Sequence, residues 1–469
     1  MRKIYTLLAV LALGGCTLSS PTDPYQPVAI PKPRGAAQGA GLLSARPPEG
    51  PLGLAEAIRI ALANNPETAA TRWDYQAAQA QYEYAWAQRL PTLSLSSSYA
   101  HYLHEQPLAP GGQPGGTGVL TDDIASGSLV LRMPIFAGGR LVNQMRAADL
   151  LQQAAGHNLA RSREQLVFNV SSAFFNILAQ RHVVASVEFS LGALEEHLKN
   201  VKAQIIAEKA TKVDRLRSEV RLADVRQRLV QEKNTLAIQQ RTLATVLGLA
   251  EHTEAISPQG DLDLEREPSV PDFEIAVAAA WSGRADYLGA KSALEAQARQ
   301  VDVARAGHWP TVSLQGSYGG RWAVGPTTGS ADTFNNLTNL GVSMDIPLFD
   351  AGQVGAQVRQ QRAKLAAAQE RLRELELQVR LDVETALLNV HSSWQRVEAL
   401  RTSIAEARES FQAEQDKYDV GEGAIVDVLD AQSALLEAQT TYYQALASLH
   451  TALAQLRLAT GQEVKGEQG

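Results

Sequence analysis

The chain has 469 residues, of which 45% are hydrophobic, 20% charged and 6% aromatic, and it contains a single cysteine. Its 43 Lys and Arg residues are outnumbered by 50 Asp and Glu, so the formal net charge is −7, and this balance argues against a nucleic-acid-binding protein. One cysteine cannot form an internal disulfide, and the composition excludes disordered and collagen-like chains but not membrane proteins of the β type.

The first residues have the features of an export signal. Arg2 and Lys3 form a positively charged start, and the apolar residues 4–13 that follow are too few to span a bilayer. The stretch ends in Leu13-Gly14-Gly15-Cys16, which resembles a bacterial lipobox. We therefore expect a lipoprotein signal peptide at 1–15, lipidation of Cys16 (palmitate), and a Pro- and Gly-rich lipidated tether at 16–50. The alternative is a plain secretory signal with a chance cysteine. Thr17, rather than Asp, follows the cysteine and implies sorting to the outer membrane.

The rest of the chain is an internal duplication. The run LVLRMPIFAGG at 129–139 recurs as VSMDIPLFDAG at 342–352, which places Pro134 and Pro347 213 positions apart. The same offset relates Asp214 to Asp427. We therefore predict one structural repeat at 51–260, a second at 261–461, and a polar C-terminal tail at 462–469.

Each repeat is predicted to contain a helix, two strands, a very long helix and a shorter helix. The long helices are expected at 140–206 and 353–419. In the second of these, apolar residues recur at every seventh position from Val383 to Tyr418, which is a coiled-coil seam. The other helices are expected at 66–88, 213–247, 285–306 and 426–460.

The predicted strands alternate between apolar and small or polar residues, as at Leu93, Ser94 and Leu95 or at Leu340, Gly341 and Val342. This pattern is typical of a membrane β-strand with a wet lumen, although a half-buried soluble hairpin remains the alternative. Polar loops are expected at 106–123 and 323–336. Four prolines are expected to mark strand ends: Pro91, Pro134, Pro310 and Pro347. Because open strand edges are not tolerated in lipid, four strands per chain require copies that share one barrel.

No enzyme motif is present. The sequence has no phosphate-binding loop, nucleophile elbow or metalloprotease helix, so neither catalytic residues nor a cofactor are expected. His101 and His104 are three positions apart on a predicted strand, where alternation places them on opposite faces, so no metal site is expected there.

Residues 53–461 resemble the TolC-like outer membrane factor family, most specifically in the run YDVGEGAIVDVLDAQSALLEAQ at 418–439. The resemblance implies a mainly α chain with membrane β-strands. It implies a homotrimer in which a long coiled-coil α-helical barrel continues into a 12-stranded β-barrel with four strands per protomer. The lipobox is similar to that of lipoprotein members of the family.

The function that the resemblance implies is transport. The duct would serve a tripartite efflux or type I secretion system, with a periplasmic adaptor and an inner-membrane transporter as partners. It would sit in the outer membrane, lipid-anchored, and extend into the periplasm. The alternative is a non-conducting helical scaffold lipoprotein.

The same resemblance assigns residues to the periplasmic mouth. It implies a constriction at Asp427 and Asp430 and a gate contact between Tyr418 and Asp214, whereas the family's gate arginine aligns with Gly423. The adaptor-contacting tips would be formed by Glu208, Lys209, Ala210, Gly421, Glu422 and Gly423. Gly421 suits a left-handed helix end, and Glu208 at the equivalent position predicts a differently built turn. From spacing alone, Asp214 and Asp427 are instead helix-start residues that the helix dipole favours by about 0.3–1 kcal/mol.

Overall fold

The computed structural model describes residues 52–108, 119–208, 210–249, 257–264, 266–324, 327 and 334–462. The signal peptide, Cys16 and the tether lie outside the described residues, as do Lys209 and all but the first residue of the C-terminal tail. All described elements belong to a single unit, Pro47–Gly469.

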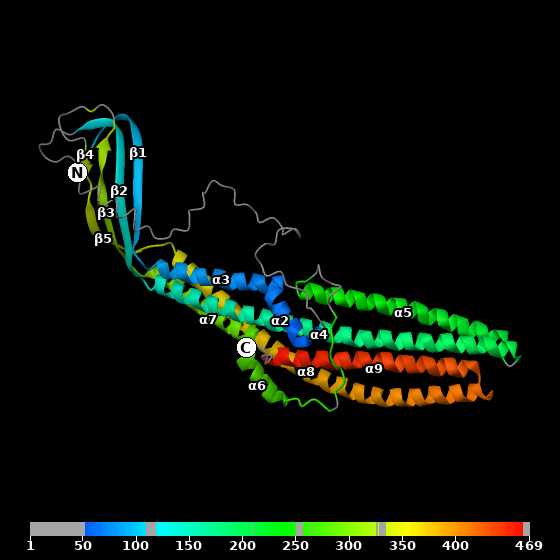
Figure 1. Ribbon diagram of the computed structural model, residues 1–469. Coiled ribbons are helices and arrows are strands. Elements are labelled where there is room, and N and C mark those ends of the chain that lie inside the picture. The colour runs from blue at the N-terminus through cyan, green and yellow to red at the C-terminus, as the bar shows by residue number, and fades with distance from the viewer. Residues whose placement is uncertain are drawn as a thin grey trace. The chain divides into compact units, whose positions relative to one another are not determined.

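The two halves of this unit follow the same order of elements (Figure 1). The first half contains α2 (Leu54–Asn64), α3 (Pro66–Ala87), β1 (Thr92–Pro107), β2 (Leu120–Ala137), α4 (Arg140–Ile206) and α5 (Lys212–Val246). The second contains α6 (Phe273–Gly283), α7 (Ala285–Arg305), the short η2 (Ala306–His308), β3 (Thr311–Ala323), β4 (Phe334–Asn336), β5 (Asn339–Asp345), α8 (Gln353–Asp419) and α9 (Ile425–Thr460).

The long helices α4 and α8 have 67 residues each, with the predicted bounds, and their first residues are 213 positions apart. The predicted seam of α8 faces inward, since Val383, Val390 and Val397 are at most 2% exposed. The short helices α2 and α6 were not predicted. The break after α2 has a local cause: Pro66 opens α3, and the Asn65 side chain accepts hydrogen bonds from the amides of Glu67 and Thr68.

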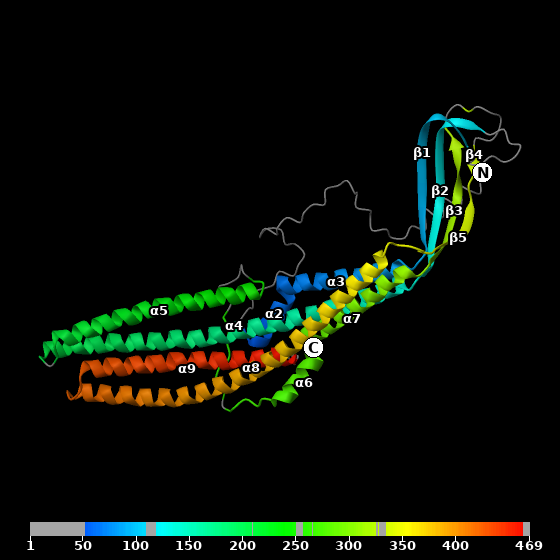
Figure 2. The same ribbon diagram turned by 180° about the vertical axis from the view of Figure 1, so that it is seen from behind.

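The long helices lie side by side along the unit, as both ribbon views show (Figures 1 and 2). Near the strands, α3 packs on α4, α4 on α7, and α7 on α8. Further along, α5 packs on α4, α4 on α9, and α9 on α8. A hydrophobic core joins α4, α5 and α9 there, with Val187, Leu194, Leu222 and Leu429 among its buried members. In this second part, α5 and α8 are therefore the outermost helices.

The strands form one antiparallel sheet in the order β1, β2, β3, with β4 and β5 both paired to β3 as two pieces of a fourth strand position. The register aligns Leu95 with Leu129 and Leu129 with Tyr318 on one face. On the other face it aligns serines, and the hydroxyls of Ser98 and Ser126 are 2.7 Å apart. The predicted alternation therefore produces one apolar and one polar face.

Two strand predictions were wrong. The first joining loop is shorter than expected, because β1 continues to Pro107 and β2 begins at Leu120. Pro134 lies inside β2 rather than at its end, at a shift in register between Pro134 and Phe136. An irregularity of this kind accommodates a proline, which has no amide hydrogen for the ladder.

Candidate functional site at the helical tips

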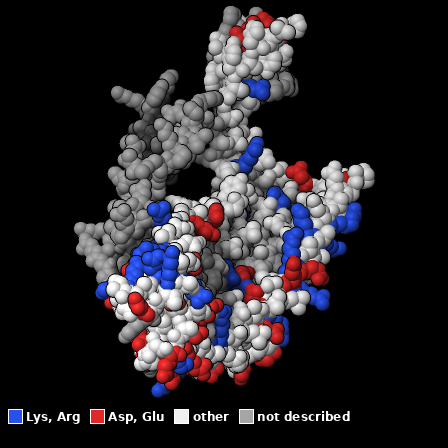
Figure 3. All heavy atoms as spheres, turned by 90° about the vertical axis from the view of Figure 1, so that its right-hand side faces the viewer, with Lys and Arg blue, Asp and Glu red and all other residues white. Residues whose placement is uncertain are grey.

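The turns that join α4 to α5 and α8 to α9 lie at the same end of the helices, away from the sheet (Figure 1). We call these two turns, with the adjoining helix ends, the helical tips. Their charged side chains of both signs are exposed at this end (Figure 3).

Both helical tips begin with the same turn, which corrects the expectation for Glu208. Glu208 has φ 59° and its amide donates to the Ile205 carbonyl at 3.1 Å, while Gly421 has φ 83° and donates to the Tyr418 carbonyl at 3.0 Å. A left-handed conformation costs a residue with a Cβ about 1–2 kcal/mol. The first tip therefore carries local strain that glycine removes from the second.

Gly423 is required by close packing of the backbone. The amides of Glu422 and Gly423 both donate to the Lys417 carbonyl, at 2.9 and 3.1 Å. A Cβ at position 423 would lie 2.9 Å from the Tyr418 backbone nitrogen and 3.1 Å from the Lys417 Cβ. Any side chain here, including the arginine that the family resemblance implies, would force this turn to move.

The Asp214 side chain caps the start of α5. Its carboxylate accepts hydrogen bonds from the Thr211 amide at 2.8 Å and the Thr211 hydroxyl at 2.7 Å, while that hydroxyl accepts from the Asp214 amide. This is a capping box, which satisfies amides that the first helical turn leaves free. The helix-start interpretation of Asp214 is therefore correct, whatever else the residue does.

Tyr418 lies between α8 and α4. Its hydroxyl donates to the Gln204 side-chain oxygen at 3.2 Å, and its ring lies 5.3 Å from that of His197. Burial raises the pKa of Tyr418, and the nearby charges of Asp214 and Asp419 raise it further. Within the described residues the hydroxyl is thus directed to Gln204, although Asp214 is close enough to act on it through its charge.

His197 is 7% exposed, and its Nε2 has no hydrogen-bond partner among the described residues. Burial lowers the pKa of His197, opposed by the negative charge of Asp419. Burial therefore favours the neutral form of the imidazole beside Tyr418. Neither His197 nor Gln204 was predicted from the sequence. A signal for His197 was available, because it lies three positions after Leu194 on a predicted long helix and therefore shares a face with this apolar, buried residue.

Asp427 and Asp430 lie on the exposed side of the first turns of α9, opposite the buried Ile425, Val428 and Leu429. Asp427 is close enough to Lys417 to contribute to the raised pKa of that lysine, after the larger effect of the hydrogen bond that Lys417 donates to Glu414. The pair is one helical turn apart on one face of α9.

Asp430 also borders a groove of about 490 Å³ between the starts of α5 and α9. Exposed apolar residues of α5 line the groove, and Arg221 crosses it to hydrogen-bond the Ser433 hydroxyl. Among the other predicted tip residues, Glu208, Gly421 and Glu422 are exposed at the turns, and Ala210 packs against the core. The helical tips therefore combine a firm core with an exposed charged rim.

Among the helices that the structure describes, none is both long and apolar enough to cross a membrane.

The sequence matches the family model "Outer membrane efflux protein" over residues 57–249 and 277–462. Outer membrane protein TolC of Escherichia coli strain K12 is 24% identical over 402 residues, covering 81% of this chain and 76% of that protein. Outer membrane protein OprJ of Pseudomonas aeruginosa is 26% identical over 467 residues, covering 92% and 90%. The crystal structure of the outer membrane protein VceC of Vibrio cholerae matches with a TM-score of 0.74 at 19% identity, covering 87% of this chain and 96% of that one. The expected fold class, long helices with strands arranged as in outer membrane channels, is confirmed.

Proposed function

The chain belongs to the outer membrane efflux protein family, and we propose that three copies form the passive exit duct of a tripartite efflux or type I secretion system. An inner-membrane transporter would drive the substrate, and the duct would catalyse no reaction of its own. The observation that carries this proposal is a sheet with one apolar and one polar face. It is joined to helices whose outermost members, α5 and α8, have no helix on their outer sides within the described residues.

The sheet supports a shared barrel. Leu95 is 77% exposed, Leu340 74% and Tyr318 69%, and the register places Leu95 and Tyr318 in one row of the apolar face. An apolar face of this extent needs lipid or protein against it. Within the described residues, β1 and the β4–β5 position form the two edges of the sheet. Three copies would pair these edges and give twelve strands, with serines toward the lumen.

The helices support the same closure. On α5, Val213, Leu216 and Val220 are 46–64% exposed, and Val230 is 69% exposed. The stripe continues between them through the exposed Ala223 and Gln227, so its members are three and four positions apart. This spacing is that of a coiled-coil seam, which requires a neighbouring helix. The outermost helix on the other side is α8, and we infer that the α8 of a neighbouring copy covers the stripe.

Charge complements this pairing. The helix α5 carries eight Lys and Arg residues against four Asp and Glu. The part of α8 that follows Val383 carries seven acidic residues against four basic ones. Opposite net charges on two helices that meet in the ring would favour their correct orientation. The exposed rim of the helical tips would then face the periplasmic adaptor.

Conductance tests this function. The purified protein, reconstituted in a planar lipid bilayer, is expected to produce stepwise ion currents from a stable trimer. A stable protein of the correct mass that inserts but never conducts would favour the non-conducting scaffold and overturn the duct.

The lipid anchor is a separate prediction, and Cys16 lies outside the described residues. Cys16→Ser is expected to abolish incorporation of radiolabelled palmitate, because the lipobox sulfur is the acceptor. Ser19→Ala, three positions further on, is the control and should be labelled like the parent. Equal labelling of the Cys16→Ser variant, or no label in the parent, would show that Cys16 is not lipidated and would leave the plain secretory signal.

A further inference from the structure

The pairing of β1 with β2 is interrupted near the end of the sheet that is away from the helices (Figure 1). The ladder is regular from Thr92 opposite Arg132 to His101 opposite Asp123, and it resumes at Gln106 opposite Thr121. Residues 102–105 of β1 therefore face Asp122 alone. A strand that bulges in this way departs from simple alternation, so side chains that are neighbours in sequence can reach the same region.

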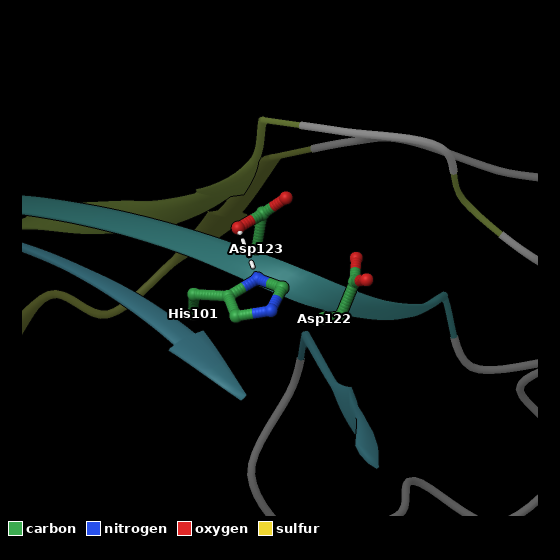
Figure 4. Close-up of side chains that lie close together, drawn as sticks. All are labelled: His101, Asp122 and Asp123. Carbon is green, nitrogen blue, oxygen red and sulfur yellow. Dashed lines mark hydrogen bonds and ion pairs between the residues drawn. The ribbon is translucent and has the colours of Figure 1, made fainter. Parts of the chain in front are cut away.

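Three side chains with metal-binding atoms meet at this interruption. One ligand atom each from His101, Asp122 and Asp123 lies within 4.8 Å of the other two (Figure 4). The Nδ1 of His101 is 2.9 Å from the Oδ1 of Asp123, and the Tyr99 hydroxyl donates to the same oxygen at 2.5 Å. The Thr121 hydroxyl accepts a hydrogen bond from the Asp123 amide and holds the local backbone. The two strands thus fix the donors from both sides.

The spacing fits a coordinated ion. Zn²⁺ binds imidazole nitrogen and carboxylate oxygen at about 2.0–2.2 Å in tetrahedral geometry, so two of its donors lie about 3.3–3.6 Å apart. The Nδ1 of His101 and the Oδ1 of Asp123 are 2.9 Å apart as a hydrogen-bonded pair, so a shift of a few tenths of an ångström would let an ion replace the shared proton. A second carboxylate beside the first is unfavourable without a cation, because two like charges at short range repel.

We propose that His101, Asp122 and Asp123 form a binding site for a divalent transition-metal ion such as Zn²⁺, with water completing the coordination. Imidazole favours such ions over Mg²⁺ and Ca²⁺, which prefer oxygen ligands alone. The side chain of Asp123 is only 21% exposed, while that of His101 is 55% exposed, so the ion can enter from solvent. A bound ion would clamp β1 to β2 where the backbone ladder is missing.

From the sequence we expected no metal site at His101 and His104, and the proposed site is not built from that pair. His104 is outside the cluster, and the partners of His101 come from the neighbouring strand instead. The proposal does not depend on conduction, since a non-conducting protein with this sheet would bind the ion equally well.

The test is calorimetric titration of Zn²⁺ into the purified trimer, freed of bound metal and carrying no polyhistidine tag. We expect one saturable site per chain and a higher thermal unfolding temperature with Zn²⁺ than without. Asp122→Asn should weaken binding at least about tenfold, and His101→Gln should do the same. Asp122→Asn is the sharper variant, because a simple His101–Asp123 ion pair does not need Asp122.

His104→Gln is the matched control, since it removes a histidine of the same strand outside the cluster. It should bind Zn²⁺ like the parent. No saturable binding by the parent trimer would overturn the proposal. Equal weakening by His104→Gln and Asp122→Asn, with the trimers intact by native mass spectrometry, would overturn it as well.

Discussion

His197 is a titratable group placed in a hydrophobic core, next to the tyrosine for which the family resemblance implies a gate role. Its imidazole packs on Tyr418, and the adjacent core contains Leu194, Leu198 and Val201. Because burial lowers the pKa of His197, the folded protein keeps the ring neutral at a pH where an unfolded chain would already protonate it. This residue therefore links the stability of the helical tips to pH.

The direction of the pH dependence of stability follows from proton binding. Below a pH of about 6.5 the unfolded chain takes up a proton at this position and the folded chain does not, so stability falls with pH until the lowered folded pKa is reached. Thermal unfolding followed from pH 8 to pH 5 should show a smaller loss of unfolding temperature in His197→Gln than in the parent. His391→Gln, at an exposed position of α8, should keep the full loss. Equal slopes for all three proteins would disprove the assignment.

At the scale of elements, the two helical tips show how a duplicated turn tolerates different residues. Equivalent hydrogen bonds close both turns, yet one has Glu208 and the other Gly421 in the left-handed region. The backbone geometry is therefore set by the helices that the turn connects, and glycine only lowers its cost.

Two glycine substitutions should act in opposite directions. A Cβ added at Gly421 or at Gly192 would meet no atom within 4 Å, but only Gly421 has a positive φ. Gly421→Ala should destabilise by about 1–2 kcal/mol, whereas Gly192→Ala, in the interior of α4, should stabilise by about 0.5–1 kcal/mol. Unfolding temperatures that rise for Gly192→Ala and fall for Gly421→Ala would confirm this. If the unfolding temperature of Gly421→Ala did not fall, the turn at Gly421 would not be left-handed.

At the scale of the whole molecule, the single chain leaves an apolar sheet face and a seam on α5 exposed. Both exposures are explained if copies close into a ring, because the contact between copies covers the seam and the closed barrel places the apolar face against lipid. The stability of the folded chain and the association of copies are therefore expected to be separable by mutation.

The seam provides the test. Val220 is 64% exposed in the chain, so Val220→Asp should leave the chain folded but place a charge in the contact between copies. We expect native mass spectrometry in detergent to show a loss of trimer with unchanged helix content by circular dichroism. Thr235→Asp, on α5 outside the stripe, should remain trimeric. A trimer that survives Val220→Asp would exclude α5 from the contact between copies.

The acidic pair of α9, Asp427 and Asp430, is expected to have its effect only when the copies assemble. Three copies of Asp427 and Asp430 would bring six carboxylates to one mouth, which attracts cations. Asp427→Asn with Asp430→Asn should lower the cation selectivity of single channels and weaken block by multivalent cations. Glu409→Gln, on α8, should change neither property. Unchanged selectivity in the double variant would place the constriction elsewhere.

The sequence by itself determined most of the elements, although not the short helices α2 and α6. The bounds of α4 and α8, the inward face of the seam and the two faces of the sheet were all predicted, because the periodicity of a helix or a strand is contained in ten to twenty consecutive residues. The family resemblance predicted the fold class, because it depends on short sequence motifs such as the run at 418–439. Local turn chemistry was less informative. Glu208 adopts a left-handed conformation that its residue type disfavours, and Pro134 lies within a strand rather than at its end, since flanking elements override local preference.

Only the tertiary structure decided which side chains meet. The hydroxyl of Tyr418 is directed to Gln204, and His101 finds its partners in Asp122 and Asp123 rather than in His104. Neither pairing is encoded in spacing along the chain. Both depend on the register between separate elements, where a shift of one residue in a strand turns every side chain to the other face.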